Sequence, residues 1–123
     1  MMPDPIGSIY YEYFKQGKVS TTGNCNYLVE GVGEDHIAKA LDFSVIDEVI
    51  PFTDKAAFAM ARRLAKEEGL LVGGSSGANV WAALAIAAKL TKPATIVTIL
   101  PDSGIKYLSK IYNDDWMRAQ QLL

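Results

Sequence analysis

The segment from Leu70 to Ala78, LLVGGSSGA, constrains the fold more than any other stretch of this chain. Its three apolar residues predict a short buried strand, its glycines and serines predict a tight turn, and the Ala-rich run that follows predicts a helix. Such a unit directs backbone N–H groups toward the helix N-terminus, where an anion or a polar ligand atom is favoured. Glycine suits this turn because side chains block close approach and because positive φ is often needed. A plain strand-to-helix connection with a serine N-cap is the alternative.

Two known motifs can be compared with this turn. Residues 73–77 match G-x-S-x-G, the nucleophile elbow of α/β-hydrolases, whose histidine base follows the serine along the chain. The only histidine, His36, precedes Ser75, so a serine hydrolase is disfavoured. A Walker A loop requires a lysine directly after its last glycine. Because Ala78 follows Gly77, this interpretation also fails.

The composition is that of an ordinary globular core. The 123 residues suffice for one domain or part of one, and the Lys and Arg residues are scattered, so neither nucleic acid nor a membrane surface is indicated as a partner. The single cysteine, Cys25, excludes an internal disulfide and fits a reducing compartment. No signal-peptide pattern opens the chain, and its most apolar run, Ala78–Ala88, is too short to cross a bilayer. We therefore expect a cytoplasmic protein.

The first half of the chain predicts short elements. The Pro-interrupted segment Met1–Gly7 predicts no helix or strand. Glu48–Phe52 predicts a strand, and Thr53 or Asp54 is expected to cap an amphipathic helix that runs to Glu68. A short aromatic helix, a short strand and a segment of near-helical spacing are expected at Ile9–Gln16, Tyr27–Glu30 and Ile37–Ile46.

The second half predicts a buried helix and a buried strand. Ala78–Ala88 has no charged residue and only Asn79 is polar, so this helix is expected to lie inside a larger body. Thr95–Leu100 is rich in β-branched residues, which is typical of a parallel strand covered on both faces. Pro101–Asp102 follows at its carboxyl end, where open α/β sheets bind ligands. Closing helices are expected at Ile105–Ile111 and Trp116–Leu123, the second capped by Asn113 or Asp114.

Together these elements predict the α/β class, with a parallel sheet flanked by helices. The turns at Ser75 and at Pro101–Asp102 leave the same edge of the sheet and are placed to converge on one ligand. No catalytic base is evident. His36 lies beside Glu34 and Asp35, but contiguous residues are not expected to converge on one ion, so no metal site is predicted.

Five segments, taken together and in order, resemble a known enzyme family. They are YLVEGVG at 27–33, ALD and VID within 40–47, EGLLVGGSSG at 68–77, ILPDS at 99–103 and NDDWM at 113–117. The chain closely resembles the C-terminal half of the catalytic core in the cystathionine β-synthase family. These are pyridoxal-phosphate enzymes of the tryptophan synthase β type (fold type II), which share their fold with cysteine synthase. The likeness covers essentially the whole chain, so residues 1–123 are expected to be one portion of such a catalytic domain.

The resemblance implies that six residues bind the cofactor, pyridoxal 5′-phosphate. The serine that corresponds to Ser75 hydrogen-bonds the pyridine nitrogen of the cofactor. The Pro-Asp pair resembles residues that wall the same side of the pocket, and the G-x-G glycines resemble those that leave room for substrate. The predicted cofactor-binding set is Ser75, Gly31, Gly33, Gly74, Pro101 and Asp102.

The sequence departs from this family in the groups that perform the chemistry. The family attaches the cofactor through a Schiff-base lysine and holds its phosphate in a Gly/Thr-rich loop, both in the N-terminal half. None of the lysines here matches that motif, and no such loop is present. We therefore expect no catalytic residue in this chain, no covalent cofactor binding by the chain alone, and no activity when it is isolated. Truncation, a split gene and a deliberately expressed fragment all remain open.

For the intact enzyme the resemblance implies β-replacement, in which L-serine and L-homocysteine condense to cystathionine. Cysteine synthesis from O-acetylserine and sulfide is the alternative within the family. A non-catalytic module that complements an N-terminal half, or that dimerises, is the alternative from another class. The expected partners are small amino-acid and thiol substrates, together with either a second copy of the chain in a homo-oligomer such as a dimer, or the missing N-terminal half.

Overall fold

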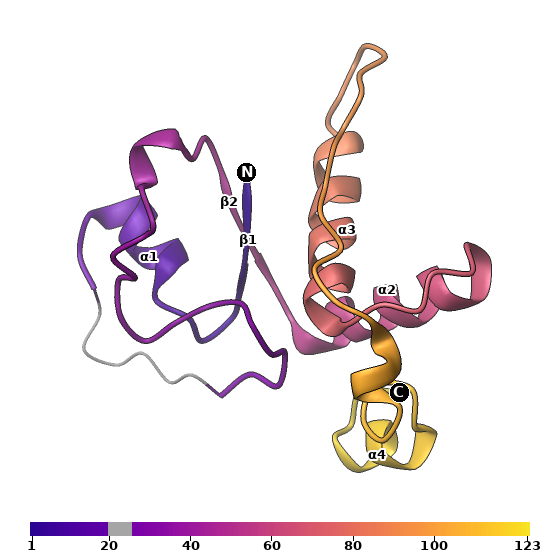
Figure 1. The fold of residues 1–123 in the computed structure, drawn as a ribbon. Helices are drawn as coiled ribbons and strands as arrows, with labels where there is room; N and C mark the ends of the chain where they lie inside the picture. Colours follow the sequence, from indigo (N-terminus) through magenta and orange to yellow (C-terminus); the bar gives the residue numbers. More distant parts are fainter. Residues whose placement is uncertain (20–25) are drawn as a thin grey trace.

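The computed structural model describes residues 1–19 and 26–123, so Cys25 lies outside the described residues. Figure 1 shows two strands between α1 and α3, with α4 near the crossing of α2 and α3. None of the helices in these two ranges is both long and apolar enough to cross a membrane. The elements are β1 (Met2–Pro5), α1 (Tyr10–Gln16), the 3-10 turn η1 (Phe43–Val45), β2 (Val49–Phe52), α2 (Asp54–Glu67), α3 (Gly74–Ala87), the 3-10 turn η2 (Gly104–Tyr107) and α4 (Asp114–Ala119).

β1 and β2 form a parallel two-stranded sheet, which confirms the predicted α/β class. The strand β1 was not expected, because prolines usually interrupt strands. Met2 N–H donates to the Glu48 carbonyl and Ile6 N–H donates to the Phe52 carbonyl, each at 2.9 Å. Even-numbered residues therefore face β2 with their N–H groups. The prolines stand at odd positions, where a missing N–H breaks no bond to β2.

The helix α2 forms as predicted because its ends are encoded locally. Thr53 Oγ1 accepts a hydrogen bond of 3.2 Å from the Ala56 N–H. Gly69, with φ +68°, follows the last turn. The buried face of α2 includes Phe58 and Ala61, which join the main apolar cluster with Ala78 of α3.

The glycines of the central turn are required for space rather than for φ. A Cβ at Gly77 would lie 2.8 Å from the backbone nitrogen of Ala61 in α2, and a Cβ at Gly74 would lie 2.7 Å from the Phe58 ring. Gly73 has φ −79°, and positive φ values occur at other glycines of the described chain. The expectation of positive φ in this turn is therefore wrong.

Two predicted strands in the second half of the chain do not form. Leu70–Val72 contributes only one antiparallel bridge, between Val72 and Ser103. Thr95–Leu100 runs along α3 without regular secondary structure (Figure 1). A strand needs a hydrogen-bonded neighbour, and the described ranges contain no strand paired with this segment. As a result Val97 is 86% exposed and Ile99 is 71% exposed.

The helix α3 is buried at its start and along one side, which is less burial than expected for a helix inside a larger body. Ala78 and Ala82 are fully buried, whereas Leu84 is 49% exposed. The side away from α2 meets the unpaired 95–100 segment, where Asn79 Nδ2 donates to the Ile99 carbonyl at 2.8 Å. The apolar sequence therefore predicts a helix that is more deeply buried than α3 is in this structure.

The remaining predicted elements form only in part. α1 forms as predicted, but residues 27–30 are not a strand and only η1 forms within 37–46. The helix expected at 105–111 is shortened to η2, and α4 ends at Ala119. Asn113 caps α4 as predicted, its Oδ1 accepting a 3.0 Å hydrogen bond from the Trp116 N–H. Local caps were therefore predicted better than element lengths.

Candidate functional site

Two loops meet at the start of α3. The Gly73 N–H donates to the Asp102 carbonyl at 3.2 Å, and the Gly104 N–H donates to the Leu71 carbonyl at 3.0 Å. These bonds place the turn before Ser75 directly beside the Pro101–Asp102 loop. The structure thus brings together the two turns that the sequence predicts at one site, although neither turn follows a paired strand.

The carboxylate of Asp102 lies against Gly73. Its Oδ2 accepts a 2.8 Å hydrogen bond from the Tyr107 hydroxyl, and its Oδ1 is buried without a hydrogen-bond partner in the described chain. A Cβ at Gly73 would collide with this Oδ1. Burial, and then the hydrogen bond to Asp102, raises the pKa of Tyr107 to about 12, so the phenol stays a donor at neutral pH. A carboxylate here also interacts favourably with the positive end of α3.

Ser75 and Ser76 lie in the first turn of α3, and both are buried. Ser76 Oγ has no hydrogen-bond partner among the residues that the structure describes. Buried hydroxyls without partners are uncommon, because they lose hydration without compensation. Gly74, also in the predicted set, is explained by its contact with Phe58. The start of α3 therefore holds two buried oxygen atoms, on Ser76 and Asp102, with unused hydrogen-bonding capacity.

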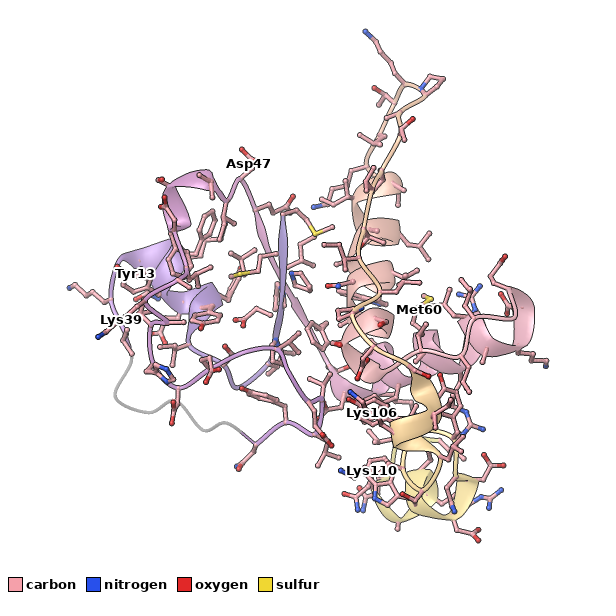
Figure 2. All side chains as sticks on the ribbon, viewed as in Figure 1. Tyr13, Lys39, Asp47, Met60, Lys106 and Lys110 are labelled. Carbon is pink, nitrogen blue, oxygen red and sulfur yellow. The ribbon has the colours of Figure 1, made fainter. Side chains whose placement is uncertain are left out.

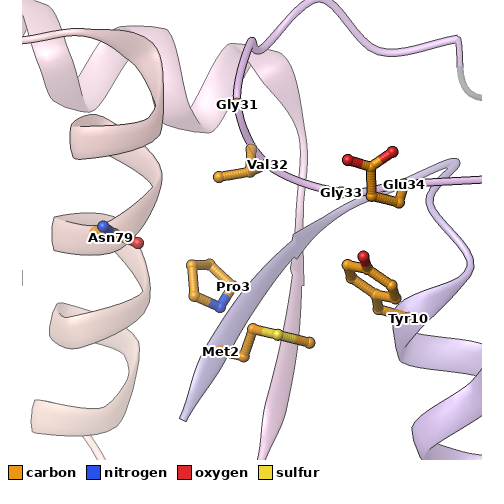
Figure 3. A pocket seen from close by; sticks show the side chains of 8 residues that line it. All are labelled: Met2, Pro3, Tyr10, Gly31, Val32, Gly33, Glu34 and Asn79. Carbon is orange, nitrogen blue, oxygen red and sulfur yellow. The ribbon is translucent and has the colours of Figure 1, made fainter. Parts of the chain in front are cut away.

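A pocket of about 300 Å³ lies between β1, the 31–34 loop and α3 (Figure 3). Gly31 has φ +78°, and a Cβ built there meets nothing within 4 Å, so the space beside it is open. Gly33 has φ +74°, and a Cβ there would crowd Pro5 and the Tyr27 hydroxyl. The pocket is lined by Met2, Pro3, Tyr10, Gly31, Val32, Gly33, Glu34 and Asn79.

The structure divides the six predicted cofactor residues between two neighbouring places. Gly31 and Gly33 line the pocket, whereas Ser75, Gly74, Pro101 and Asp102 do not. The helix α3 connects the two places. Ser75 lies in its first turn, and Asn79, one turn later, lines the pocket on the side opposite Tyr10 and Glu34 (Figure 3).

Polar groups of the pocket were missed in the sequence because distant segments supply them. Tyr10 begins α1 and Glu34 follows the G-x-G turn, and Figure 3 shows the two side by side. Burial raises the pKa of Tyr10. A hydrogen bond with the Ala38 backbone lowers this pKa, and the negative charges of Glu34 and Asp4 raise it. The aromatic pattern of residues 9–16 predicts a short helix and no pocket. No local signal joins Tyr10 to Glu34.

Asp4 is a buried carboxylate of β1 that sequence reasoning did not select. It is 1% exposed, and its Oδ2 accepts a 2.8 Å hydrogen bond from the Tyr11 N–H. Its Oδ1 is buried without a partner within residues 1–19 and 26–123. Burial raises the pKa of Asp4, against the lowering effect of hydrogen bonds from Ser8 and Tyr11. Asp4 therefore ties β1 to the start of α1 and adds negative potential near Tyr10.

The two carboxylates and the imidazole of residues 34–36 lie closer together than expected. Ligand atoms of Glu34, Asp35 and His36 are within 4.8 Å of one another, so contiguous residues do converge here. All three side chains are exposed, and His36 Nδ1 lies 2.9 Å from Asp35 Oδ1 and 3.7 Å from Glu34 Oε2. The cluster is accounted for as a surface histidine paired with its neighbouring carboxylates.

The residues present suit one side of pyridoxal phosphate only. Ser75 offers a hydroxyl and Gly31 an open approach, but the described residues that line the pocket include no lysine or arginine for an aldehyde or a phosphate. Figure 2 shows Lys39 on the α1 side and Lys106 and Lys110 beside the C-terminal turns. Lys110 pairs with Glu30, and Lys106 lies 3.9 Å from Asp102.

Comparison with known proteins gives a consistent result. Residues 4–102 match the family described as pyridoxal-phosphate dependent enzyme. The chain is 45% identical over 120 residues to cystathionine beta-synthase of Oryctolagus cuniculus, covering 98% of this chain and 21% of that protein. It is 44% identical over 114 residues to cystathionine beta-synthase of Dictyostelium discoideum, covering 93% of this chain and 22% of that protein.

Further relatives carry other names. A putative cysteine synthase of Sinorhizobium fredii is 38% identical over 127 residues, covering 98% of this chain and 34% of that protein. The crystal structure of O-ureido-L-serine synthase superposes with a TM-score of 0.74 at 29% identity, covering 94% of this chain and 37% of that one. The chain thus spans between about a fifth and just over a third of the length of these relatives.

Proposed function

The chain belongs to the pyridoxal-phosphate dependent enzyme family, and from this premise we propose that it forms the C-terminal portion of an active site for β-replacement on an amino acid. The reaction we favour is the condensation of L-serine with L-homocysteine to cystathionine. The supporting observation is the 44–45% identity to two enzymes named cystathionine beta-synthase. Cysteine synthesis from O-acetylserine and sulfide is the second candidate, supported by the relative named as a putative cysteine synthase.

We assign the cofactor contacts to residues at the start of α3 and at the G-x-G turn. The hydroxyl of Ser75 would meet the ring nitrogen, Pro101 and Asp102 would flank it, and Gly31 would leave room for substrate. Pyridoxal phosphate, when bound, supplies an electron sink for negative charge at the α-carbon of an amino acid. Ser75 offers a neutral hydroxyl, so it positions the ring without holding a proton on its nitrogen. Gly74 contributes indirectly, by allowing α3 to start against Phe58.

We propose that the lysine and the phosphate-binding loop come from polypeptide outside these 123 residues. The Asp102 carboxylate already lies against Gly73 at the positive end of α3, which makes that end unsuitable for a phosphate. The exposed apolar side chains of residues 95–100 fit the same proposal, because strand-forming sequence favours a hydrogen-bonded neighbour. A complementing segment or a homo-oligomer would supply this neighbour, and the cysteine content supports a cytoplasmic location.

Complementation with a relative tests this function. The chain is mixed, or fused, with the segment of Dictyostelium discoideum cystathionine beta-synthase that precedes its matching region, and cystathionine formation from serine and homocysteine is measured. We expect turnover that depends on pyridoxal phosphate and on both polypeptides. Ser75→Ala should reduce it, whereas Ser44→Ala, at an exposed serine in η1, should not. Turnover by the isolated chain would contradict the proposal, as would its absence from every complemented enzyme.

A non-catalytic module is the competing function. It is favoured by the lack of lysine among the described residues that line the pocket. In that case the chain would associate with a complementing segment without restoring turnover. Measuring association and turnover on the same mixtures separates the two functions.

A further inference from the structure

Glu34 is held in place by its backbone while its carboxylate stays accessible. The Ser8 hydroxyl is 3.1 Å from the Glu34 N–H and 3.3 Å from the Glu34 carbonyl, and the Ile9 N–H donates to the same carbonyl at 3.1 Å. The Glu34 side chain is 49% exposed. The nearby imidazole of His36 lies closer to Asp35 than to Glu34. Ser8 and Ile9, in the loop between β1 and α1, therefore hold the Glu34 backbone, and the Glu34 side chain lines the pocket.

The polar side of the pocket favours a positively charged group. Glu34 and the Tyr10 hydroxyl stand together at one end, and Asn79 stands on the opposite wall (Figure 3). None of the described side chains that line the pocket carries a positive charge. Buried Asp4 adds negative potential, since its charge, like that of Glu34, raises the pKa of Tyr10. A cation gains from such an arrangement because opposite charges attract strongly where water is partly excluded.

The apolar side of the pocket fits a short carbon chain. Met2, Pro3 and Val32 line it together with the open face of Gly31. A volume of about 300 Å³ admits an amino acid with a three- or four-atom side chain. Such a ligand would carry an ammonium group for Glu34 and Tyr10 and an aliphatic segment for the apolar wall.

We propose that this pocket binds the ammonium group of an amino-acid thiol through Glu34, so that Glu34 selects a thiol acceptor that carries an amino group over sulfide. The inference rests on the proposed β-replacement function, which it makes more specific. Tyr10 and Asn79 contribute neutral hydrogen-bonding groups on either side. Sulfide has no ammonium group and gains nothing from Glu34.

Four probes isolate the contribution of the amino group. The full 123-residue chain, labelled with ¹⁵N, is titrated separately with L-homocysteine and with sodium sulfide. Two analogues of homocysteine are titrated in the same way. Of these, 4-sulfanylbutanoate lacks the amino group and 3-aminopropane-1-thiol lacks the carboxylate. Binding is followed at the backbone signals of Gly31, Val32 and Gly33. We expect the two amines to bind and the other two probes to bind at least threefold more weakly.

Matched variants test the role of Glu34 itself. Glu34→Gln keeps the shape of the side chain and should weaken homocysteine binding by about three- to tenfold, the range for a half-exposed charge pair. Asp35→Asn removes an adjacent exposed carboxylate that does not line the pocket, and Glu68→Gln removes an exposed one at the end of α2. Both controls should bind homocysteine as the unmodified chain does.

Three results would overturn the inference. They are equal binding of homocysteine and 4-sulfanylbutanoate, an equal loss of affinity in Glu34→Gln and Asp35→Asn, and no binding of either amine. These titrations require neither cofactor nor turnover. A failed complementation assay would therefore overturn the proposed function while leaving the measured amine preference in place.

Discussion

The Tyr107 hydroxyl donates a 2.8 Å hydrogen bond to Oδ2 of Asp102, and the other oxygen of that carboxylate lies against Gly73. This bond links η2 to the loop beside Ser75, across the start of α3. Tyr107 is 9% exposed and belongs to the main apolar cluster. The position of the Asp102 carboxylate therefore depends on a side chain that is itself fixed by packing.

Tyr107→Phe should destabilise the chain by about 1–3 kcal/mol, because it removes the donor and leaves both oxygens of a partly buried carboxylate without a hydrogen bond from the described residues. Urea unfolding monitored by circular dichroism measures this change. Tyr11→Phe is the control, since Tyr11 is 38% exposed and its change should stay within about 0.5 kcal/mol. Equal stability of the two variants would contradict the assigned role of Tyr107.

The pair of Tyr107 and Asp102 also predicts that the stability of the chain changes with pH in the alkaline range. The pKa of Tyr107 is raised from 10.0 to about 12 in the folded chain, so the folded state holds this proton more tightly than the unfolded state. The resulting stabilisation is fully present below pH 10 and is lost as the pH rises through about 12. The stability difference between the unmodified chain and Tyr107→Phe should therefore shrink between pH 10 and 12. A difference that stays constant over this range would be inconsistent with the raised pKa.

Gly77→Ala should destabilise the chain although alanine is the better helix former. Helix propensity alone favours alanine by about 1 kcal/mol. A Cβ at Gly77 would lie 2.8 Å from the Ala61 nitrogen, however, and would force α2 and α3 apart. We expect a net loss of about 1–3 kcal/mol in thermal or urea unfolding. A stabilised variant would show that the two helices do not cross as closely as described.

Asp4→Asn should change how stability depends on acid pH. Burial raises the pKa of Asp4 above 3.8, so the stabilisation from its protonated form is greatest below pH 3.8 and is lost as the pH rises through the folded pKa. The asparagine variant should therefore gain stability relative to the unmodified chain between pH 3.8 and 7. Asp47→Asn, at an exposed position, serves as control. A relative stability that does not change with pH would refute this account of Asp4.

The sequence predicts most reliably what neighbouring residues determine. Thr53 and Asn113 each cap a helix by accepting a hydrogen bond from the N–H three residues further along the chain, and both caps are present. The family resemblance also rests on ordered local motifs. β1 was missed because its pairing with β2 joins residues 47 positions apart, and only the structure shows that both prolines point their nitrogens away from β2.

The errors arise where the environment decides the conformation. Thr95–Leu100 has the composition of a buried strand, but a strand forms only with a neighbouring strand. The glycines at 74 and 77 were explained by ligand approach, whereas Phe58 and the α2 backbone determine them. Tyr10 and Glu34 are 24 residues apart, and no periodic pattern connects them into one pocket.

We propose that this chain supplies the Ser75 side of a pyridoxal-phosphate site whose lysine lies outside these 123 residues. Cofactor retention after gel filtration, read from its absorbance, tests this most directly. It is measured for the chain alone, for the chain with the complementing segment, and for that mixture with Ser75→Ala. We predict retention only in the complemented enzyme, weakened by Ser75→Ala. Stoichiometric retention by the isolated chain, abolished by replacing one of its own lysines, would contradict the account.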